Sequence, residues 1–153
     1  MVHAFASRTT SAPGAARVLI VDDQPAVRQG LASLLRAALG RQAAVQTAAD
    51  AREALALQGA GPADVVVLDV DLAGDDGLRL LPHLLHVSRV LVLTSHADAA
   101  TRERARGLGA QAFVAKSEPA PVLLAEVRRL CAHPAGYDKA PIAGGSDTPA
   151  PMG

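Results

Sequence analysis

Four short runs of apolar residues, separated by stretches with helical spacing, constrain the fold of this chain more than any other feature. The runs cover residues 18–21, 65–68, 90–94 and 112–116 and consist mainly of Val, Leu, Ile and Ala. Short apolar runs that are rich in β-branched residues are typical of buried strands. Strands buried on both faces occur in parallel sheets, because the crossover connections that such sheets need are helices that cover them.

The segments between the runs have the spacing of amphipathic helices. Leucines three and four residues apart precede Gly40, and Asp50 is placed to cap the helix that follows it. Pro82 removes a backbone donor within another such segment, so we expect that helix to be bent or shortened. The predicted helices span residues 26–39, 50–59, 78–85, 98–108 and 119–130, and a weaker strand is predicted at residues 43–48. This alternation predicts an α/β fold with a doubly wound parallel sheet.

Length and composition limit the class of protein. The chain has 153 residues, which is enough for one domain with a substantial core. Its 15 basic and 15 acidic side chains balance, so no overall charge favours nucleic acid or an anionic membrane. Cys131 is the single cysteine, which excludes an internal disulfide framework and is compatible with the cytoplasm. No apolar run has the length of a membrane span.

The folded domain is expected to cover residues 17–132. Residues 1–16 lack the continuous apolar segment of a secretory signal, and we predict a disordered extension there. Residues 133–153 are rich in Pro and Gly and offer little to bury, so we predict a disordered tail.

Polar side chains stand where four of the predicted strands end. They are the pair Asp22 and Asp23, then Asp69, Thr94 and Lys116. The carboxyl ends of parallel strands lie at one edge of the sheet, where α/β proteins bind ligands. Three crowded carboxylates raise one another's pKa or bind a divalent cation, and Mg²⁺ is a hard ion that suits such oxygens. With that ion, a carboxylate at the strand end can attack a phosphoryl donor, and an amine and a hydroxyl can donate to its oxygens.

Each of these residues also has an ordinary structural interpretation. Asp69 fits a turn, because Asp and Gly often follow strands for local reasons. Asp23 fits a cap of the first helix, Lys116 a solvated charge and Thr94 a plain strand residue. The convergence of all of them at one sheet edge favours an aspartyl-phosphate site.

With these motifs in place, the chain resembles the receiver domains of two-component response regulators. The resemblance covers about residues 17 to 131 and includes the acidic pair, the VVLDVDLAGDDGL segment, Thr94 and the FVAK segment. It implies a flavodoxin-like (βα)5 fold with strand order 2-1-3-4-5. It also implies a stand-alone receiver, because no effector domain follows within the 153 residues.

The resemblance assigns roles at the acidic site. Asp69 matches the phosphoacceptor, and Asp22 and Asp23 match the acids that hold Mg²⁺, the second more directly and the first partly through water. Mn²⁺ is expected to substitute. Asp71 matches the position whose backbone carbonyl completes the metal shell, and Lys116 matches the lysine that pairs with the phosphoryl group.

Three further positions match parts of the family's response to phosphorylation. Thr94 matches the switch hydroxyl, and Phe113 matches the switch aromatic, although a core phenylalanine is the ordinary alternative. His96 occupies a position that often modulates dephosphorylation, with an uninvolved surface histidine as the alternative.

The chain also departs from the family pattern. Ala73 and Ser117 stand where the family commonly has proline, so the loop geometry next to Lys116 is open. The span from Asp69 to Thr94 is several residues shorter than usual.

The expected function is that of a phosphoacceptor signalling protein, not an enzyme in its own right, although it is expected to promote its own phosphorylation and dephosphorylation. A histidine kinase or a phosphotransfer protein would supply the phosphoryl group. A downstream protein would bind through the helix at 98–108, the strand at 112–116 and the last helix, with no direct contact to nucleic acid or membrane.

Two other functions are weighed against this one. A receiver fold used as a constitutive binding module would not need the intact acidic set. A haloacid-dehalogenase-like phosphatase would share the pattern of Asp69 and Asp71, but it needs its second acidic pair downstream, whereas this pair is upstream.

Overall fold

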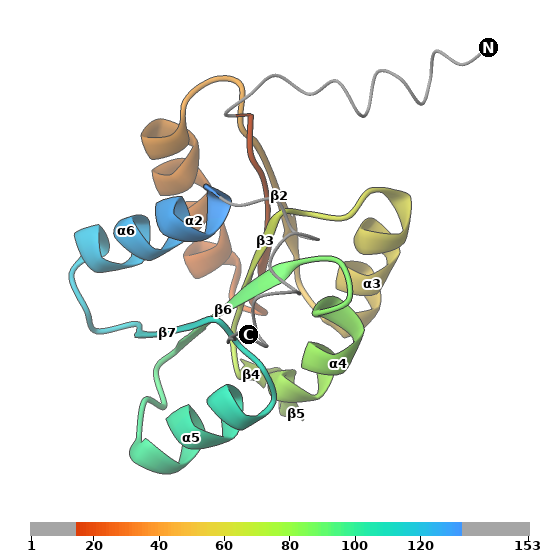
Figure 1. The fold of residues 1–153 in the computed structure, drawn as a ribbon, viewed down its shortest axis with the longest axis vertical. Helices are drawn as coiled ribbons and strands as arrows, with labels where there is room; N and C mark the ends of the chain where they lie inside the picture. Colours follow the sequence, from red (N-terminus) through yellow and green to blue (C-terminus); the bar gives the residue numbers. More distant parts are fainter. Residues whose placement is uncertain (1–14, 133–153) are drawn as a thin grey trace, which may run out of the picture.

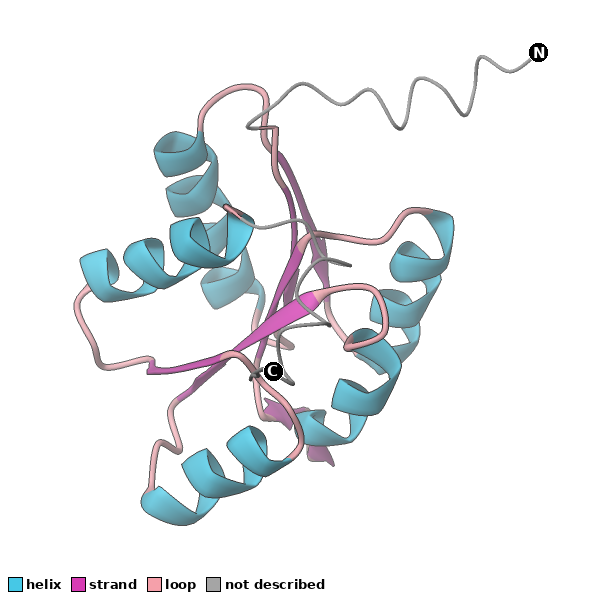
Figure 2. Cartoon of the chain, in the orientation of Figure 1, coloured by secondary structure: helices cyan, strands magenta, loops and turns pink. Residues whose placement is uncertain are grey.

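A computed structural model describes residues 15–132 of the chain, and its centre is a parallel sheet with helices on both faces (Figures 1 and 2). The sheet strands are β1 (Arg17–Val21), β2 (Ala44–Ala48), β3 (Val65–Leu68), β6 (Arg89–Thr94) and β7 (Ala112–Ala115). Their order is β2-β1-β3-β6-β7, and every pair is parallel. Counted along the chain without the short hairpin strands β4 and β5, this is the predicted order 2-1-3-4-5, so the predicted fold class is confirmed.

Helices cover the sheet in two layers, as Figure 1 shows. The helices are α2 (Pro25–Leu39), α3 (Ala51–Ala60), α4 (Leu81–Leu84), α5 (Ala99–Gly107) and α6 (Ala120–Cys131), with a 3-10 helix η1 (Gly77–Leu80) before α4. One apolar core lies between the sheet and α2 and α6, with Ile20, Leu35 and Val127 among its fully buried members. The other lies between the sheet and α3, α4 and α5, and includes Leu68 and Leu84.

Alternation of side chains along the strands builds these two cores. In β1, Val18 and Ile20 belong to the core under α2 and α6, whereas Leu19 and Val21 belong to the other. Successive side chains of a strand point to opposite faces, so a strand covered on both faces must be apolar throughout. This is why the sequence signal is a continuous run, and why the predicted sheet strands match the observed ones to within one residue at each end.

Local signals set most helix boundaries. Pro25 lies in the first turn of α2, where its missing N–H is not needed, and Gly40 ends that helix with φ +95°. The Asp50 carboxylate accepts a hydrogen bond from the Glu53 N–H at 2.8 Å, and Asp98 caps α5 in the same way through the Thr101 N–H at 2.7 Å.

The helix predicted over residues 78–85 is the clearest difference between expectation and structure. Residues Gly77–Leu80 form the 3-10 helix η1, and only one α-helical turn, α4, follows. Pro82 lies at the start of α4, which is a position proline tolerates, so the α-helix is shortened, as expected, and not bent. The preceding Asp76 caps η1 by accepting a hydrogen bond from the Leu78 N–H at 3.0 Å.

A small antiparallel hairpin, which is not predicted from the sequence, precedes η1. Its strands are β4 (Asp71–Leu72) and β5 (Asp75–Asp76), and its turn contains Ala73 with φ +54° and Gly74 with φ +92°. Proline holds φ near −65°, so it cannot occupy position 73 in this turn. The tight hairpin therefore accounts for Ala73 at a position where receiver domains commonly have proline.

Other expectations concern peptide geometry, the termini and membranes. Within residues 15–132 no peptide bond is cis, so the bond between Lys116 and Ser117 is trans. The predicted disordered segments at 1–16 and 133–153 lie outside the described residues, apart from residues 15 and 16. In the same described range, every helix is too short or too polar to cross a bilayer.

Candidate functional site

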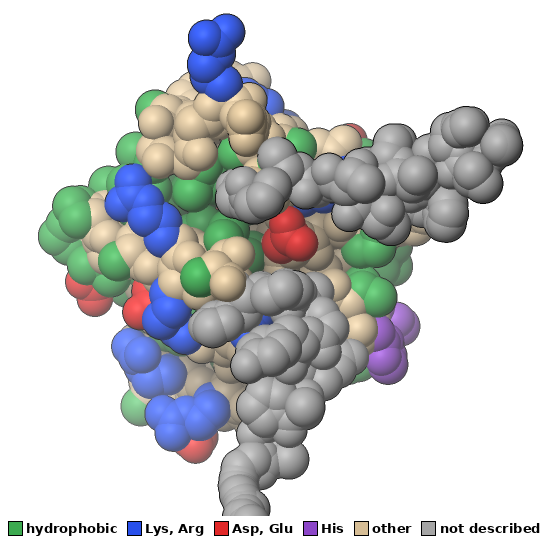
Figure 3. Space-filling model, turned by 45° about the horizontal axis from the view of Figure 1, so that its top comes forward, with side chains coloured by type: hydrophobic (Ala, Val, Ile, Leu, Met, Phe, Trp, Pro, Cys, Tyr) green, Lys and Arg blue, Asp and Glu red, His purple; other side chains and the backbone are tan. Residues whose placement is uncertain are grey.

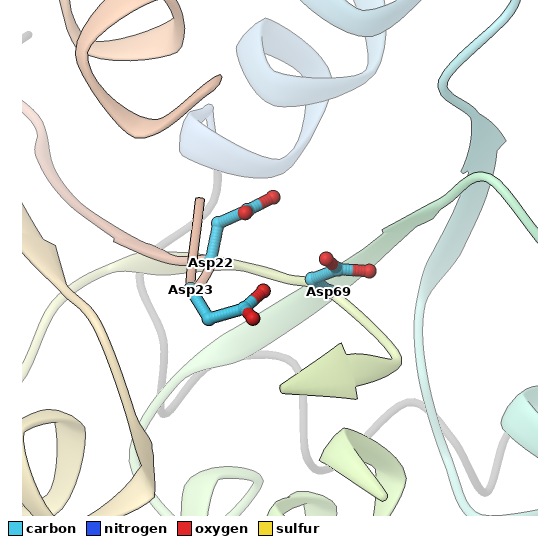
Figure 4. A group of neighbouring side chains, drawn as sticks. All are labelled: Asp22, Asp23 and Asp69. Carbon is cyan, nitrogen blue, oxygen red and sulfur yellow. The ribbon is translucent and has the colours of Figure 1, made fainter. Parts of the chain in front are cut away.

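Three carboxylates meet at the carboxyl ends of β1 and β3 (Figure 4). Asp22 and Asp23 follow β1 directly, Asp69 follows β3, and one oxygen from each lies within 4.8 Å of the others. The Asp22 N–H donates to the Ala48 carbonyl and the Asp69 N–H to the Val21 carbonyl, so the hydrogen bonding of the sheet continues through both residues. The backbone of the site is thereby held by the most buried part of the fold.

Lys116 joins two of these carboxylates. Its Nζ donates to Asp22 Oδ2 at 2.8 Å and to Asp69 Oδ2 at 3.0 Å. Its backbone N–H donates to the Thr94 carbonyl at 2.8 Å, which fixes the end of β7 beside β6. Lys116 is therefore not a solvated charge at a strand end, because its ammonium lies against two buried acids.

The charges of the site shift its protonation equilibria. Burial raises the pKa of Asp69, and the charge of Asp22 adds to this, although the hydrogen bond and charge of Lys116 act in the opposite direction. Burial alone would lower the pKa of Lys116, but its hydrogen bonds to Asp22 and Asp69 and their charges outweigh burial and raise it. Three ionised carboxylates and one ammonium leave an excess of two negative charges.

The two acids after β1 have different surroundings. Asp22 is 2% exposed and both of its oxygens are hydrogen-bonded, Oδ1 to the Gln24 N–H at 2.9 Å and Oδ2 to Lys116. Asp23 is only partly buried, and within residues 15–132 its carboxylate accepts no hydrogen bond. The N-cap of α2 is Gln24 and has no side-chain hydrogen bond, so Asp23 does not cap that helix. Asp23 is the carboxylate with free acceptor capacity.

The chain after Asp69 folds closely around it. The Asp71 N–H donates to Asp69 Oδ1 at 3.3 Å, while the exposed Asp71 side chain accepts from the Gly74 N–H in the hairpin turn. Gly77 lies against the phosphoacceptor candidate, because a Cβ at this position would stand 2.0 Å from the Asp69 carbonyl oxygen. Gly77 is not predicted as a site residue from the sequence. Its only sequence signal is its place at the end of an Asp-rich segment.

The three candidates for the response to phosphorylation occupy separate environments. Thr94 is fully buried at the end of β6, and its Oγ1 accepts a hydrogen bond from the His96 N–H at 2.9 Å. The His96 residue itself is exposed. Phe113 is half-buried in β7, packs against the core under α3 to α5, and has the Arg102 guanidinium 4.6 Å from its ring centroid. A cavity of about 210 Å³ lies beside this ring between α5 and β7.

The residues present fit a hard divalent cation. Carboxylate oxygens are the ligands that Mg²⁺ and Ca²⁺ prefer. The cluster supplies three carboxylates in reach of one another, an excess of negative charge, and one acid that has no hydrogen-bond partner among residues 15–132. Its position at the carboxyl edge of a parallel sheet leaves room for a ligand from outside.

Comparison with known proteins decides the family. The model of the response regulator receiver domain matches residues 18–128. The chain belongs to this family. Receiver domains are signalling phosphoacceptors that bind Mg²⁺ at an acidic pocket, so this comparison confirms the expected family and class of function and does not favour the phosphatase alternative.

Among curated proteins, the receiver resembles longer regulators. It is 36% identical over 104 residues to the Fimbriae Z protein of Salmonella typhimurium, a match that covers 66% of this chain and 49% of that protein. It is 38% identical over 118 residues to the transcriptional regulatory protein CutR of Streptomyces coelicolor, covering 74% of this chain and 52% of CutR. The chain thus spans about half the length of these relatives.

Solved structures give the same assignment. A response regulator from Burkholderia pseudomallei, solved with a phosphorylated aspartic acid, a calcium ion and citrate, is 31% identical with a TM-score of 0.64. That match covers 74% of this chain and 71% of the other. The chemotaxis protein CheY4 of Vibrio cholerae is 28% identical with a TM-score of 0.68, covering 76% and 98%. Response regulators act with histidine kinases and downstream effectors.

Proposed function

We propose that this receiver accepts a phosphoryl group on Asp69 from a histidine of a kinase or phosphotransfer protein. The observation that carries the proposal is the position of this carboxylate. It is buried at the end of the central strand β3, with Lys116 on one oxygen and two further acids within 4.8 Å. A turn residue would not need a partly buried ammonium partner, and a constitutive binding module would not need the acidic pair.

The acids divide the binding of the cation between them. Asp23 and Asp69 are assigned as direct ligands, because Asp23 has no hydrogen-bond partner in the described part of the chain and Asp69 carries the reacting oxygen. Asp22 is assigned a contact through water, since each of its oxygens already has a donor. The Asp71 carbonyl is assigned as the backbone ligand. Mg²⁺, or Mn²⁺ in its place, would supply positive charge at the phosphoryl group when held by these residues.

The transfer itself needs a nucleophile and donors. An ionised oxygen of Asp69 forms the new O–P bond, the P–N bond to the donor's imidazole breaks, and the histidine leaves as a neutral ring after protonation. Lys116 Nζ and the Thr94 hydroxyl are assigned as donors to the phosphoryl oxygens, which bear more charge in the transition state. The same residues would support self-catalysed hydrolysis of the phosphoryl group. His96 is assigned as a residue that modulates this hydrolysis.

The output is assigned to a protein-binding surface formed by α5, β7 and α6. Phosphorylation adds roughly 1.5 to 2 negative charges, and Thr94 is the buried hydroxyl that can turn toward them. Space vacated under β7 is then available to the half-buried Phe113 ring, so one of two existing states gains population. Figure 3 shows basic side chains gathered on this side of the molecule. The exposed arginines there are Arg102, Arg104, Arg106, Arg128 and Arg129.

The test of the proposed function is direct labelling of the full chain. The protein is incubated with a small acyl phosphate and Mg²⁺, and intact mass and site mapping follow the product. Asp69→Asn should lose all labelling, whereas the control Asp75→Asn, an exposed acid of the hairpin, should be labelled at the native rate. Stoichiometric labelling of Asp69→Asn at the native rate would show that another residue is the acceptor.

A further inference from the structure

Helix α5 touches both the loop beside Asp69 and the ring of Phe113. Arg104 forms an ion pair and hydrogen bond with Asp76 of the hairpin strand β5. Two residues earlier in the helix, Arg102 lies over the Phe113 ring at 4.6 Å. Two arginines of one short helix therefore connect the hairpin beside Asp69, where the cation is proposed to bind, with Phe113, the proposed switch residue.

Asp76 is close in structure to the groups expected to hold the cation. In the β4–β5 pair it stands opposite Asp71, the residue assigned a carbonyl ligand, whose N–H donates to Asp69 Oδ1. The next residue, Gly77, packs on the Asp69 carbonyl and donates its N–H to the Val70 carbonyl. A displacement of Asp76 would therefore be transmitted to the backbone of Asp69 and of the two residues after it.

We propose that Arg104 and Asp76 are positioning residues for the metal site. Their ion pair holds the hairpin so that the Asp71 carbonyl reaches the cation beside Asp69, and it couples that site through α5 and Arg102 to Phe113. This inference rests on the proposed function, because it takes the cation at Asp69 as given. The alternative is an exposed ion pair that contributes nothing to the metal site. Arg104 and Asp76 are 51% and 31% exposed, so the two cases need to be separated by experiment.

Three substitutions separate these cases when metal affinity is measured by calorimetry with Mg²⁺ or Mn²⁺ alone. Arg104→Gln removes the charge, and Asp76→Asn removes it while keeping an oxygen that can accept from the Leu78 N–H. Each should weaken binding by about threefold, the size expected of a half-exposed pair. The double variant should lose no more than either single one, because both remove the same interaction. Arg104→Lys should restore most of the affinity.

The control is Arg106→Gln on the same helix. The Arg106 side chain forms no ion pair within residues 15–132, so its loss changes the charge of α5 without touching the hairpin. Native affinity in this variant, beside weaker binding in Arg104→Gln, supports a specific contact. Equal weakening in both would reduce the effect to a general disturbance of α5, because loss of a positive charge alone favours cation binding, and would overturn the proposal.

The coupling to α5 has its own readout, because the chain contains only two phenylalanines, Phe5 and Phe113. Fluorine NMR of protein labelled with 4-fluorophenylalanine gives two signals, and Phe5→Leu assigns them. Mg²⁺ with beryllofluoride should shift the Phe113 signal in the native chain and in Arg106→Gln, with a smaller shift in Arg104→Gln at saturating metal.

The outcomes distinguish a failure of the proposed function from a failure of the positioning role. A native chain that binds neither metal nor beryllofluoride would overturn the proposed function itself. A native chain that binds and responds, together with Arg104→Gln and Asp76→Asn variants of native affinity and native Phe113 response, would overturn the positioning role alone.

Discussion

Polar side chains are buried at both edges of the central sheet, the amino ends and the carboxyl ends of its strands. Their hydrogen bonding differs between the two. At the amino ends of β3 and β6, Gln58 and Ser88 form a closed neutral set with the backbone of Ala63. Gln58 Nε2 donates to Ser88 Oγ at 2.8 Å, Ser88 Oγ donates to the Ala63 carbonyl at 2.7 Å, and the Ala63 N–H donates to Gln58 Oε1 at 2.9 Å. At the carboxyl ends, Lys116 donates hydrogen bonds to two acids, and the third acid accepts none from the residues that the structure describes.

The difference separates a structural polar cluster from a functional one. The amino edge is neutral, and its side chains satisfy one another, so it needs no ligand and stabilises the ends of the strands. The carboxyl edge keeps two excess negative charges, which are costly without a cation. Burial and polarity are similar at the two edges, so unbalanced charge is the property that marks the binding site.

The strongest test of this comparison is to remove Lys116. Lys116→Met should lower the free energy of unfolding at neutral pH by about 3 kcal/mol, because it leaves two buried carboxylates without a cation. Chemical unfolding monitored by circular dichroism measures this loss. Mg²⁺ should reduce it, since the ion supplies part of the missing charge. A loss of equal size with and without Mg²⁺ would mean that Lys116 serves packing and not charge balance.

A smaller effect is expected at the opposite edge. Ser88→Ala should cost about 1 to 3 kcal/mol, because the Gln58 amide and the Ala63 carbonyl each lose a buried partner. The same unfolding experiment measures it, and the loss should be independent of Mg²⁺ while metal affinity stays native. A changed metal affinity in Ser88→Ala would contradict the separation of a structural edge from a metal-binding edge.

The smallest effect concerns the protonation of Asp69 in metal-free protein. Its pKa is raised in the folded state, so between the folded and unfolded pKa values the native protein binds more protons than the unfolded chain. Stability from this residue is therefore greatest at low pH and is lost as pH rises through the folded pKa. Asp69→Asn, which is neutral at every pH, should be more stable than the native chain at pH 7.

That advantage should shrink as pH falls through the folded pKa of Asp69, and Mg²⁺ should stabilise only the native chain. Paired melting curves of the two proteins across acidic and neutral pH measure the difference. An advantage that is constant with pH would show that the Asp69 carboxylate carries no penalty from burial.

Local sequence patterns are enough to predict the alternation of strands and helices and the end of the sheet at which the polar residues meet. Continuous apolar runs encode strands buried on both faces, and polar residues after Val21, Leu68, Leu93 and Ala115 then fall at one edge in any parallel sheet. Capping by Asp50 and Asp98 is equally local, which is why these helix starts were predictable.

Tertiary structure alone decided which of those polar groups pair. Lys116 reaches Asp22 across 94 residues and Asp69 across 47, while Asp23, next in the chain to Asp22, has no partner within residues 15–132. Arg104 likewise selects Asp76 over the neighbouring Asp75. Periodicity fixes the face on which a side chain lies, but a hydrogen bond also requires distances of about 3 Å, and those depend on how the crossovers and the hairpin bring separate elements together.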